Sequence, residues 1–225
     1  MTHTLTLQSI SPVTHDTHHL VFDRPDGIAF APGQAVDLSL DRDGWRDEKR
    51  PFTFTSLPSE LTLEFVIKSY PDHDGVTERI GRLSPGDRVL IEDPWGAIQD
   101  RGGHSVFIAG GAGVTPFIAI LRARLAEAGT LDGCTLIFSN ATEKDIILRD
   151  SFEGMEGLNC VFTVTDQTKA EVRTSRIDQA FLADHVGDDV EAYYICGPDP
   201  MIDDMKRALR ALGVEDERIV TENFD

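Results

Sequence analysis

The spacing of apolar residues changes near the middle of the 225-residue chain, and this change constrains the fold more than any other feature. Up to about residue 98, short runs of alternating or β-branched apolar residues are separated by turn residues. These runs predict antiparallel strands that close into a small barrel. From residue 105 onward, buried-strand runs alternate with segments of helical apolar spacing. That alternation predicts a parallel sheet with crossover helices.

The two halves can be divided into expected elements. Strands are expected in the first half at 4–10, 17–22, 34–40, 50–56, 61–68 and 87–92, with one helix near 76–83. In the second half, strands are expected at 106–109, 135–139, 160–165, 192–196 and 218–221, and helices near 116–128, 143–152, 175–185 and 200–212. We therefore predict two domains, residues 1–99 with a six-stranded antiparallel β-barrel and residues 104–225 with a Rossmann-like α/β sheet of five parallel strands.

Charge and cysteine usage exclude several classes of function. The chain has 21 Lys and Arg against 39 Asp and Glu, a formal net charge of −18, which disfavours a nucleic-acid partner. No stretch reaches 18 apolar residues and no basic, then apolar leader opens the chain, so no membrane segment is expected and a cytoplasmic protein is predicted. The cysteines at 134, 160 and 196 lie far apart, so no metal or iron–sulfur site is expected.

The buried strand at 106–109 is followed directly by a glycine-rich run, Gly110-Gly111-Ala112-Gly113-Val114-Thr115-Pro116. Glycines at such a turn let the backbone approach a diphosphate, and the positive end of the next helix favours the anion. Thr115 is expected to cap that helix, and Pro116 suits its first position. The run departs from G-x-G-x-x-G because Pro116 stands where the third glycine would be. It predicts a dinucleotide phosphate site; a tight turn without a ligand is the alternative.

Two further segments carry chemically useful side chains. The strand at 50–56 begins with Arg50-Pro51-Phe52-Thr53, whose guanidinium, ring and hydroxyl suit a phosphate, a flat heterocycle and a ring nitrogen. The strand at 192–196 ends in Cys196, followed by Gly197-Pro198-Asp199-Pro200-Met201. Because the carboxyl ends of parallel strands form the ligand edge of a sheet, Cys196 is expected beside the glycine-rich run. An ordinary edge strand and a buried structural cysteine are the alternatives.

Taken in chain order, the segments that begin at Arg50, Gly110 and Cys196 resemble the R-x-[YF]-[ST], G-G-x-G-[IV]-T-P and C-G-P-x-x-M motifs of the ferredoxin-NADP reductase superfamily. The resemblance covers almost the whole chain. It implies a flavin-binding barrel followed by a nicotinamide-dinucleotide domain. The residues that it assigns to the flavin are Arg50, Pro51, Phe52, Thr53, Val66, Ile67, Lys68, Gly75, Val76, Thr77 and Phe224. Those that it assigns to NAD(P) are Gly110, Gly111, Ala112, Gly113, Val114, Thr115, Pro116, Cys196, Gly197, Pro198 and Met201.

The resemblance also implies hydride transfer from NAD(P)H to the flavin, with FAD favoured over FMN, and electron release to an acceptor. Its expected catalytic residues are Thr53 at the flavin N5 edge, Cys196 beside the nicotinamide, and Glu222. Phe224 would cover the exposed face of the flavin, with an apolar plug between the domains as the alternative. Asp93-Pro94-Trp95-Gly96 is similar to the family's turn that closes the barrel, a structural role.

NADH is favoured over NADPH as the donor. The segment 138–149 resembles the NADH-dependent cytochrome b reductase branch, and no serine–arginine pair for a ribose 2′-phosphate is evident there. Arg173 and Arg176 are the basic side chains that could still reach such a phosphate.

The expected partner is a separate electron acceptor, such as a ferredoxin, a flavodoxin or an oxygenase component, served by a monomeric reductase. An electron-transfer subunit of a larger redox complex and a non-enzymatic nucleotide-binding redox module are the alternatives. Arg42, Arg46, Lys49 and Arg50 form one basic cluster near the expected flavin edge. This cluster is either a docking patch for the acceptor or a solvated loop.

Overall fold

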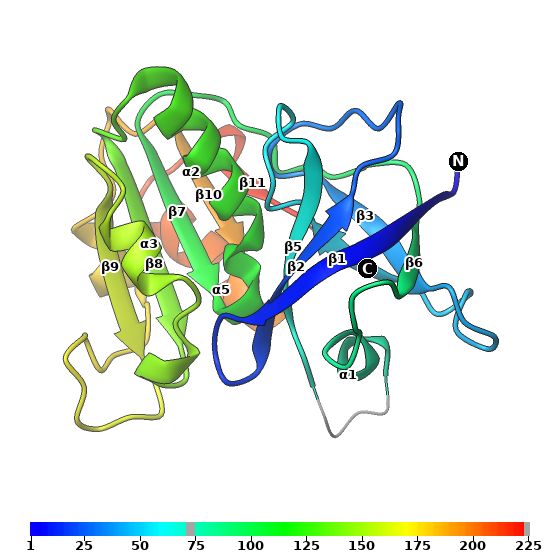
Figure 1. Ribbon diagram of the computed structural model, residues 1–225. Coiled ribbons are helices and arrows are strands. Elements are labelled where there is room, and N and C mark those ends of the chain that lie inside the picture. Colours follow the sequence, from blue (N-terminus) through cyan, green and yellow to red (C-terminus); the bar gives the residue numbers. More distant parts are fainter. Residues whose placement is uncertain (71–74, 223–225) are drawn as a thin grey trace.

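The first half of the chain folds into a six-stranded antiparallel sheet that curls into a nearly closed barrel (Figure 1). The computed structural model describes residues 1–70 and 75–222. The barrel strands are β1 (His3–Pro12), β2 (Thr17–Asp23), β3 (Ala35–Leu40), β4 (Arg50–Thr53), β5 (Thr62–Lys68) and β6 (Arg88–Ile91), in the order β4-β3-β6-β1-β2-β5. The Thr55 N–H donates to the Glu64 carbonyl at 2.8 Å, which brings the two ends of the sheet together.

The barrel encloses its own apolar core. Side chains such as Leu5, Phe22 and Phe65 point inward from alternate positions of the strands and are fully buried. The short helix α1 (Val76–Ile80) closes one end, because Val76 and Ile80 pack into the same core. Burial of this kind stabilises the barrel by about 25 cal/mol per Å² of apolar surface removed from water.

The second half forms a five-stranded parallel sheet in the order β11-β10-β7-β8-β9. Its strands are β7 (Ser105–Gly110), β8 (Cys134–Asn140), β9 (Asn159–Val164), β10 (Ala192–Cys196) and β11 (Ile219–Thr221). The helices are α2 (Thr115–Ala128), α3 (Arg149–Glu153), α4 (Gln179–Ala183) and α5 (Asp199–Ala211), with 3-10 turns η1 (Gly111–Val114), η2 (Glu143–Asp145) and η3 (Asp216–Arg218).

Helices cover both faces of this sheet, so its strands are apolar on both sides. Phe107 of β7 stacks on Tyr194 of β10 beneath α2, with ring centroids 4.9 Å apart. The alternate residues, including Val106 and Ile195, face α5 and form a second core cluster. The predicted fold class, an antiparallel barrel followed by a five-stranded parallel α/β sheet, is confirmed. The domain limits of 1–99 and 104–225 stay a prediction.

Two expected helices are shorter than predicted. The segment 143–152 divides into η2 and α3, because Leu148 has a left-handed backbone with φ 53° and the chain leaves helical geometry at Ile146. This break lets Ile146 and Ile147 both be buried although they are adjacent in sequence. The helix expected at 175–185 is restricted to α4, since Asp178 caps it by accepting a hydrogen bond from the Phe181 N–H at 2.8 Å. Over the described residues, none of the helices is both long and apolar enough to cross a membrane.

Candidate functional site

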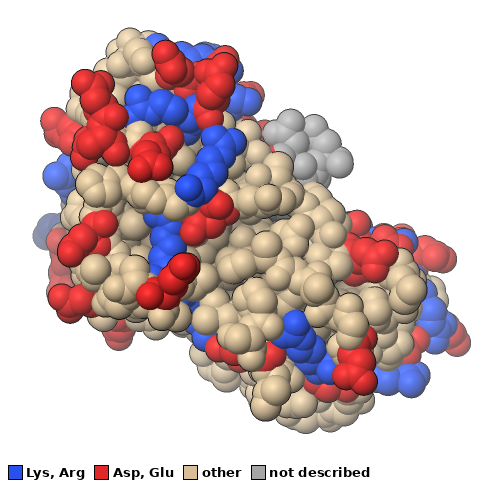
Figure 2. All heavy atoms as spheres, turned by 90° about the horizontal axis from the view of Figure 1, so that it is seen from above, with Lys and Arg blue, Asp and Glu red and all other residues tan. Residues whose placement is uncertain are grey.

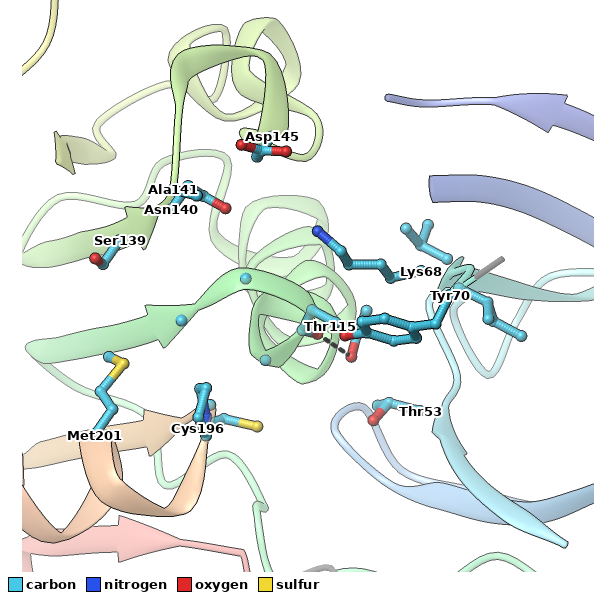
Figure 3. A pocket seen from close by; sticks show the side chains of 18 of the residues that line it. Thr53, Lys68, Tyr70, Thr115, Ser139, Asn140, Ala141, Asp145, Cys196 and Met201 are labelled. Atoms are coloured by element: carbon cyan, nitrogen blue, oxygen red, sulfur yellow. Dashed lines mark hydrogen bonds between the residues drawn. The ribbon is translucent and has the colours of Figure 1, made fainter. Parts of the chain in front are cut away.

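A cavity of about 570 Å³ lies between the barrel and the carboxyl ends of β7, β8 and β10 (Figure 3). Its volume is in the range of small-molecule and cofactor sites, and it lies at the edge where ligands bind in open parallel sheets. It has three walls, which we call the loop wall (Gly110–Gly113, Thr115 and Cys196–Pro198 with Met201), the barrel wall (Pro51–Thr53, Val66–Lys68, Tyr70 and Thr77) and the strand-end wall (Ser139–Ala141, Asp145 and Thr165).

The loop wall depends on glycines because backbones meet there. A Cβ atom at Gly113 would lie 2.3 Å from the Cys196 carbonyl oxygen, which is a backbone atom that cannot move aside. A Cβ at Gly110 would lie 2.5 Å from the Met201 sulfur, which belongs to a flexible side chain. Gly111 has φ +53°, a conformation that side-chain-bearing residues rarely adopt. The glycines therefore shape a close turn whose backbone faces the cavity.

The prediction that Thr115 caps α2 is wrong. The turn η1 precedes the helix, so Thr115 is already helical, with φ −58° and ψ −42°. Its Oγ1 donates to the Ala112 carbonyl at 3.0 Å inside the loop wall. Pro116 follows at the second helical position, where its missing N–H costs nothing. The helix therefore begins at Thr115 without a side-chain cap, directly after the glycine run.

Cys196 ends β10 at the centre of the cavity. Its thiol points across the open space toward the Thr53 hydroxyl of the barrel wall (Figure 3). Burial, reinforced by the nearby Glu222 carboxylate, raises the pKa of the Cys196 thiol to about 12. Cys196 is therefore a neutral, uncharged thiol at working pH, suited to packing against a flat ring rather than to attack on one.

The barrel wall contains most of the residues expected to meet a flavin. Pro51, Phe52 and Thr53 of β4, Val66, Ile67 and Lys68 of β5, and Thr77 of α1 all line the cavity. Tyr70 was not predicted; its ring extends into the cavity from the end of β5 (Figure 3). An aromatic residue two positions beyond a predicted ligand-lining strand was the signal that could have identified it.

Some expected residues lie outside the described lining of the cavity. Arg50 is exposed, and its Nη1 donates to the Lys49 carbonyl at 2.6 Å. Gly75 is the residue before α1 and has φ −106°, an ordinary value. The side chains of Val76 and Val114 and the first-turn Pro116 are buried. Phe224 lies outside the described residues, so its expected place over the flavin stays a prediction.

Glu222 follows β11 and is buried, with 2% of its surface exposed. Its Oε1 accepts a hydrogen bond from the Ala97 N–H at 2.7 Å, whereas its Oε2 has no hydrogen-bond partner within residues 1–70 and 75–222. Burial raises the pKa of this carboxyl, and the backbone N–H groups of Ala97 and Ile98 oppose the shift. Gly96, at φ +135°, leaves the space that Glu222 occupies, since a Cβ there would lie 2.7 Å from Oε1. Glu222 thus lies near Cys196 but outside the described cavity lining, and its hydrogen bond to Ala97 joins the two halves of the chain.

The sequence analysis used the segment 138–149 to predict the donor, but it named none of the residues of the strand-end wall as site residues. Ser139 and Asn140 end β8, Ala141 follows it, Asp145 ends η2, and Thr165 follows β9. Their signal is positional: they lie at or after the carboxyl ends of β8 and β9, the edge that binds ligands in such sheets.

Asp145 also links the two halves of the molecule. Its Oδ2 accepts from the Thr142 N–H at 2.8 Å, and its Oδ1 lies 3.7 Å from the His15 Nε2 of the β1–β2 turn. Asp16 in that turn pairs with the Lys68 Nζ at 2.9 Å. The ligand atoms of His15, Asp16 and Asp145 lie within 4.8 Å of one another. Since Lys68 already neutralises Asp16, we base no metal site on them, and the expectation of no metal stays a prediction.

The basic cluster is neutralised by its neighbours. Arg42 pairs with Asp87 at 2.9 Å and Lys49 with Glu92 at 2.6 Å. Arg46 pairs with both Asp41 and Asp43. On the face shown in Figure 2, Lys and Arg lie interspersed with Asp and Glu over both lobes. The geometry therefore favours a solvated, ion-paired loop over a docking patch.

Comparisons with known proteins agree with this architecture. Residues 4–99 match the oxidoreductase FAD-binding domain, and residues 107–207 match the oxidoreductase NAD-binding domain. The chain is 27% identical to NADH-cytochrome b5 reductase 2 of Mycosarcoma maydis, over 88% of this chain and 62% of the relative. It is 28% identical to the propane 2-monooxygenase reductase component of Rhodococcus jostii, over 96% of this chain and 61% of the relative. The chain thus spans about three-fifths of the length of these two relatives.

The structure of the CS-b5R domains of human Ncb5or in its NAD⁺ form superposes with a TM-score of 0.87 at 26% identity, covering 99% of this chain and 70% of that one. Together the two family models span most of the sequence and coincide with the barrel and the parallel sheet. The chain belongs to the ferredoxin-NADP reductase-like superfamily and carries an FAD-binding and a NAD-binding domain.

Proposed function

We propose that the chain is an NADH-dependent flavoprotein reductase, which takes a hydride from NADH into a bound FAD and delivers the electrons to a separate acceptor. The observation that carries this proposal is the cavity itself. It brings Thr53 of the barrel wall and Cys196 of the loop wall face to face, with the glycine run beside them (Figure 3). Two flat rings held between those side chains would lie in the stacked arrangement that hydride transfer requires.

The barrel wall fits a flavin. Val66 and Ile67 supply an apolar surface for the ring system, the Thr53 hydroxyl can hydrogen-bond its edge, and Thr77 stands near the start of α1 for a phosphate. Bound there, the flavin supplies the chemistry of hydride acceptance and electron release. The chain orients its ring and excludes water from one face, which the buried Thr53 and Val66 accomplish.

The loop wall fits the diphosphate of a dinucleotide. The absence of side chains at Gly110, Gly111 and Gly113 leaves N–H groups at the start of a helix open to an anion. Cys196 then borders the half of the ligand nearest the barrel, and Met201 lies on the side of Cys196 away from Thr53 (Figure 3). Because the Cys196 thiol stays protonated, its role is to set the depth at which the nicotinamide ring packs.

The strand-end wall supports NADH as the donor. Asp145 supplies a carboxylate to this wall. A carboxylate at this edge accepts hydrogen bonds from the ribose hydroxyls of NADH and repels the 2′-phosphate of NADPH. Lys68 is the single cationic residue among the described lining residues, and it is paired with Asp16. Arg173 and Arg176 are exposed and lie outside the described lining.

The acceptor is proposed to be a separate protein, such as an oxygenase component, a ferredoxin or a flavodoxin. One relative is named as the reductase component of a monooxygenase, and another as a cytochrome b5 reductase. Both relatives are longer than this chain. The protein is further proposed to be a cytoplasmic monomer. Its two domains are proposed to comprise residues 1–99 and 104–225.

The test begins with flavin binding. The purified protein is incubated with FAD or FMN, desalted and denatured, and the released flavin is identified by chromatography. We expect one FAD per chain. Failure to retain either flavin would overturn the proposal and favour a non-enzymatic nucleotide-binding module.

A further inference from the structure

A second cavity lies between the two halves of the chain, apart from the cavity described above. It has a volume of about 660 Å³, and its lining comes from α2 and α3 of the parallel-sheet half and from β1, β2 and β5 of the barrel (Figure 1). The volume is in the range of small-molecule sites. Nothing in the proposed reductase reaction uses this cavity.

The buried part of its lining is apolar apart from one hydroxyl. Val66, Ile118, Ile146 and Phe152 line the cavity, each with at most 5% of its surface exposed. The fifth buried lining residue is Thr55, which is 2% exposed and lies between β4 and β5. The cavity therefore offers an apolar surface with a single buried polar side chain.

The backbone of Thr55 is paired, but its hydroxyl is not. The Thr55 N–H donates to the Glu64 carbonyl at 2.8 Å, and the Thr55 carbonyl accepts from the Arg122 Nη1 at 2.7 Å. Its Oγ1 is buried and has no hydrogen-bond partner within residues 1–70 and 75–222. Native proteins pair the large majority of such groups, and valine has the same shape without the hydroxyl. Packing alone thus does not explain a threonine at this position.

The charged side chains of the lining are already satisfied. Arg122 pairs with Glu60 at 2.6 Å, Arg149 with Glu153 at 3.0 Å, and His19 with Glu64 at 3.0 Å. The remaining ionisable residue of the described lining, Asp150, is exposed to solvent. Since the buried part of the cavity holds no charge, it favours a neutral ligand.

The backbone is strained in the wall of the same cavity. Leu148 lines it with φ 53°, and over the described part of the chain it is the only residue other than glycine with a positive φ. Strain of this kind is concentrated at ligand-binding sites, where the surrounding structure holds it in place. The strained backbone and the unpaired hydroxyl therefore belong to one site.

We propose that the second cavity binds a small neutral molecule with an apolar body and one hydroxyl group, such as a phenol or an alcohol of similar size. The ligand hydroxyl pairs with the Thr55 Oγ1, since each group can both donate and accept. The apolar body packs on the buried side chains around it. Val66 lines both cavities, but the inference does not depend on the proposed function.

Phenol and toluene test this site because only phenol carries a hydroxyl. Calorimetry measures the Kd of each for the full chain with FAD added, in the wild type, Thr55→Val and Thr55→Ser. We expect Thr55→Val to weaken phenol binding roughly fivefold relative to toluene, the effect of one lost hydrogen bond, and Thr55→Ser to keep the wild-type ratio. The matched control is Thr53→Val, which removes a buried hydroxyl from the first cavity and should also keep the ratio.

A second readout is stability without a probe. Because the Thr55 hydroxyl is unpaired, the melting temperature of Thr55→Val should not fall below that of the wild type. A clear fall would show that the hydroxyl is paired within the folded chain, and would overturn the proposal.

The binding data can also overturn it. Absence of phenol binding by the wild type, a ratio that Thr55→Val leaves unchanged, or an equal change in Thr53→Val would each contradict the site. If Thr55→Val does not fold, wild-type crystals soaked in 4-bromophenol decide: anomalous scattering from bromine in the second cavity supports the proposal, and its absence there overturns it. None of these results bears on the reductase proposal, which flavin retention tests separately.

Discussion

The loop wall and the strand-end wall of the cavity are built in different ways. In the loop wall, the backbones of Gly113 and Cys196 approach so closely that no Cβ atom fits between them. In the strand-end wall, ordinary backbone ends two strands, and the side chains of Asn140, Asp145 and Thr165 face the open space. Under the proposed function, the first wall binds a ligand through backbone geometry, which constrains the residue types, whereas the second uses side chains that many residue types could replace.

The largest effect is expected where two backbones meet. Gly113→Ala should lower stability by about 2–3 kcal/mol and abolish most dinucleotide binding, because the Cβ would overlap the Cys196 carbonyl. Gly110→Ala is the matched control: its Cβ meets the movable Met201 side chain, so its loss of melting temperature should be smaller. Melting curves and ADP-ribose titrations measure both. Equal effects of the two variants would show that the close backbone contact at Gly113 does not set the requirement for glycine in the loop wall.

A second prediction concerns the carboxyl behind the loop wall. Because burial raises the pKa of Glu222, the folded state favours its protonated form and loses stability as the pH rises through that pKa. Glu222→Gln removes this ionisation. The melting temperature of the variant relative to the wild type should therefore increase as the pH rises above about 4, the ordinary pKa of a glutamate in the unfolded chain. A difference that is constant with pH would show that Glu222 titrates normally.

In the reductase assay, the same substitution should slow turnover while leaving dinucleotide binding nearly intact.

The strand-end wall should control the choice of donor. Asp145→Asn removes the carboxylate and keeps the size of the side chain, so kcat/KM for NADPH should rise roughly tenfold relative to that for NADH. Flavin retention should be unchanged, since Asp145 is not among the barrel-wall residues that are expected to meet the flavin. An unchanged ratio would remove Asp145 from the specificity residues and leave the donor preference to another group.

The difference between the walls explains what the sequence could predict. The glycine run and Cys196 are identifiable because close backbone contact allows few residue types, and the order of strands and helices follows from apolar periodicity. Asn140, Asp145 and Tyr70 could not be assigned, because their roles arise from which strand ends the sheet topology brings together. The capping of Thr115 was misjudged since the extra turn η1 depends on the positive φ of Gly111, which the sequence permits without requiring.

The smallest effect is expected in the ion-paired basic cluster. Arg42→Gln removes one exposed pair with Asp87, and such pairs contribute little to stability. Melting temperature and the rate with a protein acceptor should both stay close to the wild type. A large fall in the acceptor rate alone, steeper at low salt, would instead identify this loop as the docking patch.

The central claim is that the cavity holds a reducible flavin beside a bound NADH, and anaerobic rapid mixing tests it most directly. The FAD-loaded protein is mixed with NADH or NADPH, and the visible absorbance of the oxidised flavin is followed through a single turnover. We predict that the absorbance is lost with both donors and faster with NADH at equal concentration. A protein that retains FAD but keeps its oxidised absorbance with either donor would contradict the account.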